Sequence, residues 1–198
     1  MVCGLLDQVA EALTPFTIAK VEGDAVFCYA HDEIIDGQGT LELMSSAYEA
    51  FRAQTTLIED AGGCPCPACG LVGTVGLKFV LHHGEFAMHR IAGHTELIGR
   101  DVIVVHRLLK NAVSDGTLRD YILATRPWTD RFGVDVDTLE RGTATYDHVG
   151  TIEFTVRDLQ ANIAPHAIPS TRPTGSAGAC SYVPSPIRRS AATNDYGQ

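Results

Sequence analysis

Three cysteines lie within six residues of one another, in the segment Cys64-Pro-Cys66-Pro-Ala-Cys69. Thiolates are soft ligands that suit Zn²⁺ or an Fe–S centre, and three so close in sequence can converge on one ion. The two prolines stiffen the loop and favour thiols that are arranged in advance. We therefore predict a zinc or iron site at Cys64, Cys66 and Cys69, with redox or disulfide chemistry and a plain loop as the alternatives.

A structural zinc site needs a fourth ligand. The residues that could supply it are Cys28, Cys180, His82 and His83, and the sequence does not choose among them. His82 and His83 come together at the end of an expected strand, where adjacent side chains point to opposite faces. We interpret each histidine as packed or solvated and not as a catalyst.

A carboxylate beside a tight turn is the second feature that could do chemistry. Two β-prone runs, 16–21 and 25–29, flank Glu22-Gly23-Asp24, and glycine tolerates the positive φ of a tight hairpin. Asp24 would then lie just past a rigid tip, where a carboxylate can hold a divalent cation. One carboxylate does not make a site, so an ordinary solvated turn residue is the alternative.

Apolar periodicity predicts the elements that would position these residues. Residues 2–13 and 40–60 have apolar side chains at helical spacing, and Pro15 ends the first helix. Residues 101–112 combine strand propensity with a helical apolar face, and we predict a helix. The remaining expected elements are a strand at 77–82, its hairpin partner at 86–91, a loop at 93–99, a strand at 120–125, one or two short helices within 126–142, and a last strand or hairpin at 144–156.

The composition and element order predict the domain organisation. The chain has 198 residues, of which 45% are hydrophobic and 20% charged, as is typical of a globular protein. The element order favours an α+β domain over residues 1–163, with a Cys-rich loop at 61–70 and a mainly antiparallel sheet covered by helices on one face. Pro, Ser, Thr, Ala and Gly dominate after residue 163, so we predict a disordered tail at 164–198.

Charge and hydropathy exclude several classes of protein. The formal charge of −9 disfavours a nucleic-acid-binding protein, since such proteins carry a net-positive surface. No apolar run approaches the roughly 20 residues of a membrane span. The N-terminal segment has no basic start and is interrupted by Asp7 and Glu11, so it is not a signal peptide. We therefore expect a cytoplasmic protein that has no membrane partner and whose thiols stay reduced.

Three motifs, in the right order, resemble the class III nucleotide cyclases, the catalytic domains of adenylate and guanylate cyclases. Lys20-Val-Glu-Gly-Asp24 resembles their hairpin, Leu77–Gly84 their strand ending in apolar-His-x-Gly, and Glu96–Leu109 their loop and helix ending in Arg-Leu. The likeness covers about residues 2–125. With the Cys loop, the chain looks still more like a bacterial cyclase-related family of unknown function. The resemblance implies a ferredoxin-like, cyclase-type fold.

This resemblance also implies roles for individual residues. Lys20 matches the residue that reads the purine, Glu96 stands at the base-selecting position, and Arg107 matches an arginine that stabilises transition-state charge. The position four before it, Asn in active cyclases, is Ile103 here, and isoleucine cannot donate a hydrogen bond.

The catalytic Mg²⁺ or Mn²⁺ ions of cyclases are held by two aspartates, and Asp24 matches one of them. The other lies on a first strand that we expect to be missing, because the chain begins at the helix that follows it.

Together these features predict a degenerate cyclase-like module that binds a purine nucleotide or acts in signalling or assembly, without efficient turnover. The alternatives are an active nucleotide cyclase when the upstream strand is present, and a zinc or iron sensor that uses the Cys loop. Cyclase active sites form across a two-chain interface, so the resemblance also implies a homodimer. The preference for adenine or guanine stays open.

Overall fold

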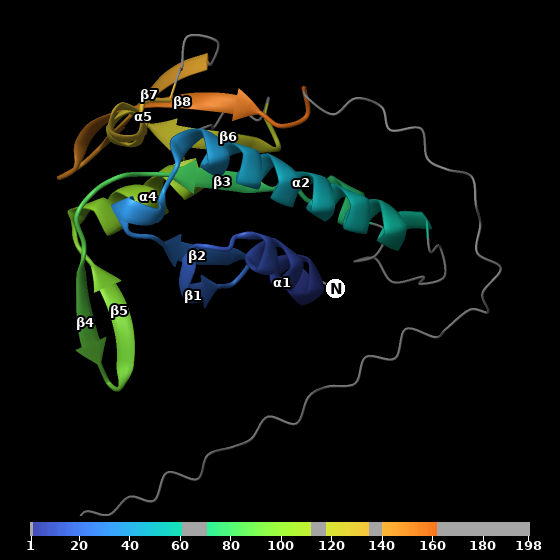
Figure 1. Cartoon of the computed structure of the whole chain (residues 1–198), viewed down its shortest axis with the longest axis horizontal. Helices are drawn as coiled ribbons and strands as arrows, with labels where there is room; N and C mark the ends of the chain where they lie inside the picture. The colour runs from blue at the N-terminus through green and yellow to red at the C-terminus, as the bar shows by residue number, and fades with distance from the viewer. Residues whose placement is uncertain (1, 61–70, 112–117, 135–139, 162–198) are drawn as a thin grey trace, which may run out of the picture.

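The computed structural model describes residues 2–60, 71–111, 118–134 and 140–161. These residues form an α+β fold with four described helices and three sheets (Figure 1). The helices are α1 (Val2–Ala12), α2 (Gly37–Asp60), α4 (Arg100–Asn111) and α5 (Arg126–Phe132). The strands are β1 (Thr17–Glu22), β2 (Ala25–Tyr29), β3 (Lys78–Leu81), β4 (Ala87–Ile91), β5 (His94–Ile98), β6 (Tyr121–Thr125), β7 (Glu140–Tyr146) and β8 (Gly150–Asp158).

Most of the strand pairing is antiparallel, as the sequence predicts. The largest sheet has the order β3-β6-β8-β7, in which β3 and β6 are parallel and the other two pairs are antiparallel. The hairpins β1–β2 and β4–β5 each form a separate two-stranded antiparallel sheet. The α+β class is therefore confirmed, with one mixed sheet at its centre.

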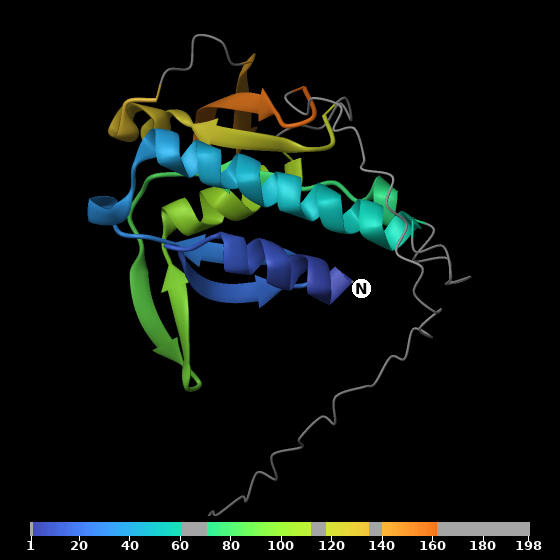
Figure 2. The same ribbon diagram turned by 45° about the vertical axis from the view of Figure 1, so that its right-hand side comes forward.

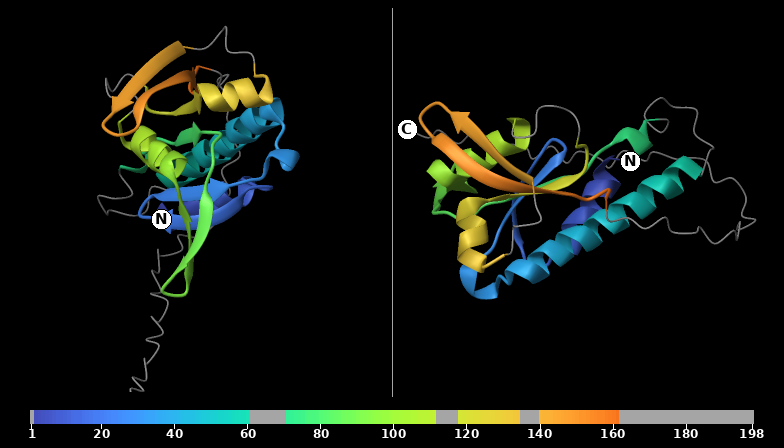
Figure 3. Two further views of the ribbon diagram at one scale, coloured as in Figure 1. Left: turned by 90° about the vertical axis from the view of Figure 1, so that its left-hand side faces the viewer. Right: turned by 90° about the horizontal axis from the view of Figure 1, so that it is seen from above.

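Helices cover both faces of this sheet, not one face as expected. All five residues of β6 are buried. Ile122 and Ala124 pack into a core with α1 and α2, whereas Tyr121 and Leu123 pack with α4 on the opposite face. A continuous apolar run such as β6 is typical of a strand that is covered on both sides. Figure 3 shows α2 and α4 on opposite sides of the sheet.

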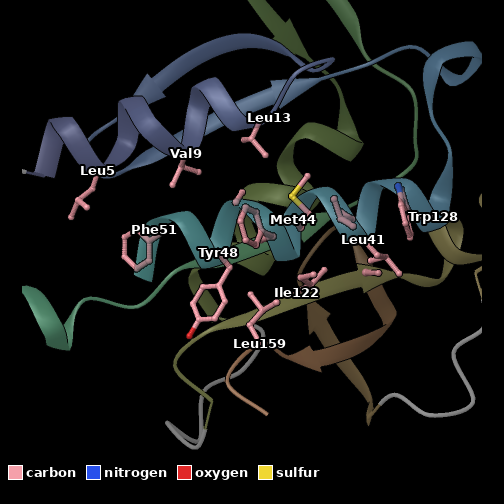
Figure 4. Packing of buried hydrophobic residues seen from close by; sticks show 14 of the residues in the cluster. Leu5, Val9, Leu13, Leu41, Met44, Tyr48, Phe51, Ile122, Trp128 and Leu159 are labelled. Carbon is pink, nitrogen blue, oxygen red and sulfur yellow. The ribbon is translucent and has the colours of Figure 1, made fainter. Parts of the chain in front are cut away.

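The first helix closes the larger core. Leu5, Val9 and Leu13 recur at four-residue spacing and are buried, so they form one stripe along α1 and the turn after it. Figure 4 shows these side chains pointing toward α2, where Met44 and Tyr48 lie. Each fully buried side chain of this size stabilises the fold by about 1.5–3 kcal/mol. The helix predicted at residues 2–13 is thus confirmed.

The long helix α2 begins earlier than predicted. Asp36 Oδ2 accepts a 2.7 Å hydrogen bond from the Gly39 backbone N–H, the arrangement of an N-terminal cap. The sequence pattern placed the start of this helix at residue 40, but Thr40 is buried and lies within the helix. In the sequence, Asp36 stands three residues before Gly39, and aspartate is a preferred capping residue, so this spacing was the signal for the true start of the helix.

The pairing of the 86–91 strand was predicted wrongly. It forms β4, whose partner is β5, so residues 94–98 are a strand and not part of a loop. The two strands meet at a tight turn in which Ala92 has φ +49° and Gly93 φ +86°. The β3 strand pairs instead with β6, which is distant in sequence. The β4–β5 hairpin projects from the molecule as an arm (Figure 1, Figure 2).

The C-terminal part of the domain forms one short helix and one hairpin. Helix α5 ends at Gly133, whose φ of +63° suits a glycine cap, and residues 140–142 begin β7 where a helix was expected. β7 and β8 confirm the predicted final hairpin. The Cys loop at 61–70 and the expected tail at 164–198 lie outside the described residues. Among the described helices, none combines the length and apolarity needed to cross a bilayer.

Candidate functional site

Lys20 and Glu96, which the sequence singled out separately, contact each other. Lys20 lies on β1 and Glu96 on β5, and Lys20 Nζ lies 3.3 Å from Glu96 Oε2. Their side chains are 34% and 35% exposed, so a ligand could reach both. The contact joins the middle of strand β5 in the β4–β5 arm to the β1–β2 hairpin. A cation and a carboxylate held side by side offer a donor next to an acceptor.

Glu22 extends this contact toward α4. Its Oε1 lies 2.8 Å from Lys20 Nζ, and its Oε2 lies 3.5 Å from His106 Nδ1. The His106 ring also stacks on Phe27 of β2, with ring centroids 4.9 Å apart. These contacts fix the hairpin against α4 and thereby hold Lys20 in place. Glu22 follows Lys20 by two residues, so both point to the same side of the strand.

The two carboxylates around Lys20 favour its charged form. The hydrogen bond to Glu22 raises the pKa of Lys20 above its ordinary value; burial opposes this shift, and Glu96 adds to it. The same hydrogen bond lowers the pKa of Glu22. Lys20 is therefore a permanent cation, and Glu22 a permanent anion, near neutral pH.

Asp24 and Arg107 do not join this cluster through any described contact. Asp24 is exposed, at the second position of a two-residue turn in which Gly23 has φ +62°. Arg107 is exposed on α4, with its guanidinium carbon 5.7 Å from the centroid of the Tyr146 ring on β7. Ile103, on the same helix, is 50% exposed. Of the residues proposed to act together, the structure brings together only Lys20 and Glu96.

A large cavity lies beside this cluster. It has a volume of about 1340 Å³ and is lined by every residue of β2 and every residue of β3, which belong to separate sheets. Apolar side chains of α1 and α4 form further walls, including Val9 and Val105. Glu22 and Asp24 lie at its boundary, whereas Lys20 and Glu96 do not line it.

His82 lies in the wall of this cavity with two polar partners. Its Nδ1 is 2.8 Å from the Thr125 hydroxyl, and its Nε2 is 3.4 Å from Asp101 Oδ1. The side chain is 6% exposed, and burial lowers its pKa although Asp101 acts in the opposite direction. His82 is therefore a neutral, packed histidine at neutral pH, as the sequence analysis interpreted it.

His83 has a different set of partners. Its Nε2 lies 3.3 Å from Asp32 Oδ2, and its ring meets Phe132 edge-on. Asp32 also accepts a 2.8 Å hydrogen bond from Arg131, which lowers the pKa of the Asp32 carboxyl. Both histidines line the same cavity, but each is held by its own group of side chains.

Comparison with known proteins places the chain in a family. Residues 2–117 match the family described as "Protein of unknown function (DUF2652)". The chain belongs to this family. It is also 31% identical, over 174 residues, to the uncharacterized protein Rv2561/Rv2562 of Mycobacterium tuberculosis strain H37Rv. That alignment covers 83% of this chain and 76% of the mycobacterial protein.

The DUF2652 match includes the whole Lys20–Glu96 cluster. It extends from α1 through α4 and therefore contains Lys20, Asp24, Glu96 and Arg107, together with both strands that line the cavity. The strands β6, β7 and β8 lie beyond the matched residues. The descriptions of the family and of the mycobacterial relative name no activity.

The described residues around Asp24 do not by themselves form a complete site for a divalent cation. Asp24 is a single exposed carboxylate, and within the described ranges no three His, Cys, Asp or Glu side chains come together as a metal-ligand group. Mg²⁺ at nucleotide sites is held by one or two carboxylates together with water and phosphate oxygens, so Asp24 alone supplies only part of such a site. We therefore assign no metal-dependent step to Asp24.

The cysteine site lies outside what the structure describes, because Cys64, Cys66 and Cys69 fall within residues 61–70. Of the possible fourth ligands, His82 and His83 have the partners given above, and the structure also describes Cys28. It is half-buried beside the core of α1 and α2, and burial raises the pKa of its thiol. Thiolate is the form that binds metal, so this environment disfavours Cys28 as a ligand.

Sequence reasoning missed Glu22, His106 and Phe27. Glu22 could have been found, since alternate residues of a strand share a face. The contact of Phe27 with His106 joins residues distant in sequence, and no local pattern indicates it.

Proposed function

We propose that this DUF2652 protein is a purine-nucleotide-binding module, related in design to the class III cyclases but without efficient turnover. The observation that carries the proposal is the contact between Lys20 and Glu96. The resemblance assigned both residues to base recognition, although they are 76 positions apart, and their polar atoms lie 3.3 Å from each other.

The chemistry of this pair suits the edge of a purine base. Adenine presents a ring nitrogen that accepts a hydrogen bond next to an amino group that donates one. Guanine presents a carbonyl oxygen beside an N–H. A lysine ammonium can donate to the acceptor while a carboxylate accepts from the neighbouring donor. Both purines satisfy this pattern, so the pair does not select between them.

The residues expected to act on the phosphates support binding more than catalysis. Ile103 has no hydrogen-bond donor to orient a ribose or phosphate. The Arg107 guanidinium lies over the Tyr146 ring and has no described contact with the Lys20–Glu96 cluster. We therefore expect a bound nucleoside triphosphate to be converted slowly or not at all.

The proposed module acts as a homodimer. The β4–β5 arm exposes Met88, Ile91 and Ile98, each 44–51% accessible, and such apolar side chains on a projecting hairpin suit a protein–protein contact. A second copy is the expected partner because Glu96, in the middle of β5 on this arm, belongs to the proposed nucleotide site. The nucleotide site and the dimer interface would then share the β4–β5 arm.

The proposal is tested by equilibrium binding of ATP and GTP to the purified chain, followed by a product assay with Mn²⁺. We expect saturable binding of at least one nucleotide and no cyclic product above background. Lys20→Ala should weaken binding by about tenfold or more, since a charged hydrogen bond to the base is lost. Lys78→Ala removes the same charge from β3, at a site that contacts the Tyr121 ring, and should leave binding unchanged.

Two results would contradict the proposal. If neither nucleotide binds at millimolar concentration, the binding module does not exist. If cyclic nucleotide accumulates and its formation depends on Arg107, the protein is an enzyme, and the proposal that it lacks efficient turnover is wrong.

A further inference from the structure

We propose that Asp101 is the residue that positions the β4–β5 arm and thereby holds Glu96 against Lys20. The arm leaves the body of the molecule through two connectors, residues 82–86 after β3 and Gly99 before α4. Asp101 is the second residue of α4 and contacts the first of these connectors. The consequence for nucleotide binding rests on the proposed function, whereas the control of the Lys20–Glu96 contact does not.

Both carboxylate oxygens of Asp101 face the first connector. Oδ2 accepts a 2.8 Å hydrogen bond from the Glu85 backbone N–H, and Oδ1 lies 3.4 Å from Nε2 of His82. On its other side, His82 Nδ1 lies 2.8 Å from the hydroxyl of Thr125, a fully buried residue at the end of β6. Asp101 therefore ties the connector to α4 at two points, and His82 continues this link into the core.

The two connectors and Asp101 leave no room for a further side chain between them. A Cβ on Gly84 would lie 2.4 Å from Asp101 Cγ and 2.6 Å from Asp101 Cβ. A Cβ on Gly99, whose φ is +154°, would lie 3.0 Å from the Glu85 carbonyl oxygen. Glycine is the residue that permits so close an approach of the backbone. The root of the arm is therefore packed tightly enough to fix the direction in which the arm projects.

The Lys20–Glu96 contact is too weak to set this direction by itself. Both side chains are partly exposed, and exposed ion pairs contribute little to stability. The pair of His83 with Asp32, which holds the same connector, is equally exposed. Asp101 is less exposed than any of these four side chains, so its contacts hold the arm more firmly.

The arm acts as a lever because Glu96 lies three residues from the root at Gly99. Three strand residues span about 10 Å, so a rotation of the arm by about 20° moves Glu96 by about 3.5 Å. A movement of this size, directed away from Lys20 Nζ, breaks a contact of 3.3 Å. Loss of the Asp101 contacts should therefore separate the pair without unfolding either hairpin.

The position of the arm is measured by zero-length carbodiimide cross-linking of the full chain, with the products mapped by mass spectrometry. Lys20 Nζ lies 3.3 Å from Glu96 and 2.8 Å from Glu22, so the cross-link within β1 is an internal reference for the cross-link to the arm. We expect Asp101→Ala to lower the ratio of arm cross-link to reference by about twofold or more, because the Glu85 N–H loses its acceptor. Asp101→Asn keeps an acceptor oxygen for this N–H and should keep the wild-type ratio, although it removes the charge from the first turn of α4.

Two further variants separate this positioning role from a general loss of stability. Gly84→Ala drives a Cβ into the Asp101 side chain and should lower the cross-link ratio as Asp101→Ala does. Asp130→Ala removes an exposed carboxylate that pairs with Arg126 on α5, and it should leave the ratio unchanged. Thermal unfolding checks that each variant is folded. An unchanged ratio in Asp101→Ala, or an equal loss in Asp101→Asn, would overturn the proposal.

Calorimetry with ATP and GTP tests the consequence for the proposed nucleotide site. Asp101→Ala should weaken binding by about fivefold, the effect of losing one hydrogen bond. It should have no further effect in a Glu96→Gln background, because Asp101 acts through Glu96. If the wild type binds neither nucleotide, the proposed function fails, and the cross-link ratio still decides whether Asp101 positions the arm. If Glu96→Gln weakens binding but Asp101→Ala does not, the nucleotide site stands and the positioning role of Asp101 is overturned.

Discussion

Asp120 shows how much of this fold depends on a single buried carboxylate. It is fully buried and accepts hydrogen bonds from the Leu77 backbone N–H at 2.7 Å, the Gln160 side chain at 2.6 Å and the Tyr48 hydroxyl at 3.2 Å. These partners come from the start of β3, the end of β8 and the middle of α2. A buried charge with this many donors ties three distant segments together.

We predict that Tyr48→Phe lowers the free energy of unfolding by about 1–3 kcal/mol, because it removes a donor from a buried charge. Burial raises the pKa of Tyr48 to about 12, and the Asp120 charge acts in the same direction, so the hydroxyl keeps its proton. Tyr146→Phe is the matched control: its hydroxyl is buried and has no hydrogen-bond partner among the described residues. Urea unfolding should show the loss for Tyr48→Phe alone, and equal effects of the two substitutions would contradict this account.

His82 should make stability depend on pH. Burial depresses its pKa in the folded protein below the value of about 6.5 in the unfolded chain, so the unfolded state binds more protons as the pH falls. Asp101 opposes this shift, whereas His83 and Arg100 add to it. Stability is therefore full above the unfolded pKa and is lost progressively below it.

The measurement is urea unfolding between about pH 7.5 and pH 5.5 for the wild type and His82→Gln. Glutamine can keep the hydrogen bond to Thr125 but does not titrate. We expect the wild type to lose more stability than the variant over this range. The same loss in both proteins would assign the pH dependence to other groups.

At the scale of elements, the start of α2 depends on Asp36. We predict that Asp36→Ala lowers stability by about 1 kcal/mol, because the Gly39 N–H loses its capping acceptor. Asp60→Ala removes an aspartate from the other end of the same helix, where negative charge is unfavourable, and should be neutral or stabilising. Thermal unfolding of the two variants decides the matter, and a larger loss for Asp60→Ala would show that Asp36 is not the cap.

Some elements could be predicted from their local pattern alone. Helix α4 was identified correctly despite its Val102–Val105 run, because Val102, Val105 and Leu108 also recur at helical spacing. The structure buries Leu108 of this set, together with Val104. Strand β5 was missed because its turn places Ala92 at positive φ, a conformation that alanine rarely adopts. The sequence therefore offered no turn signal before Gly93. The parallel pairing of β3 with β6 depends on contacts distant in sequence, which local patterns do not encode.

At the scale of the whole molecule, the arrangement of layers was the least predictable feature. The apolar run of β6 was a sign of burial on both faces, but the second helix layer follows only from where α4 packs. The candidate site, too, could be predicted only in part. Lys20 and Glu96 were each singled out by the resemblance. Their contact, and the cavity beside β2 and β3, follow only from how the separate sheets are placed.

The exposed arm should control the oligomeric state. We predict that the wild type forms a dimer in sedimentation experiments and that Ile91→Lys shifts it toward monomer, because a charge on the apolar hairpin opposes burial. Leu57→Lys is the control, since Leu57 is also exposed and belongs to the last turn of α2. That end of the helix lies away from the arm (Figure 1). A monomeric wild type, or an equal effect of both substitutions, would contradict the dimer.

The central claim is that Lys20 and Glu96 form one binding unit for a purine base. A double-mutant cycle tests it most directly, with ATP and GTP affinities measured by calorimetry for the wild type, Lys20→Ala, Glu96→Gln and the double variant. We predict that each single substitution weakens binding, and that the double variant binds no more weakly than the worse of the two. Unchanged affinity in every variant, or simple addition of two independent losses, would contradict the claim.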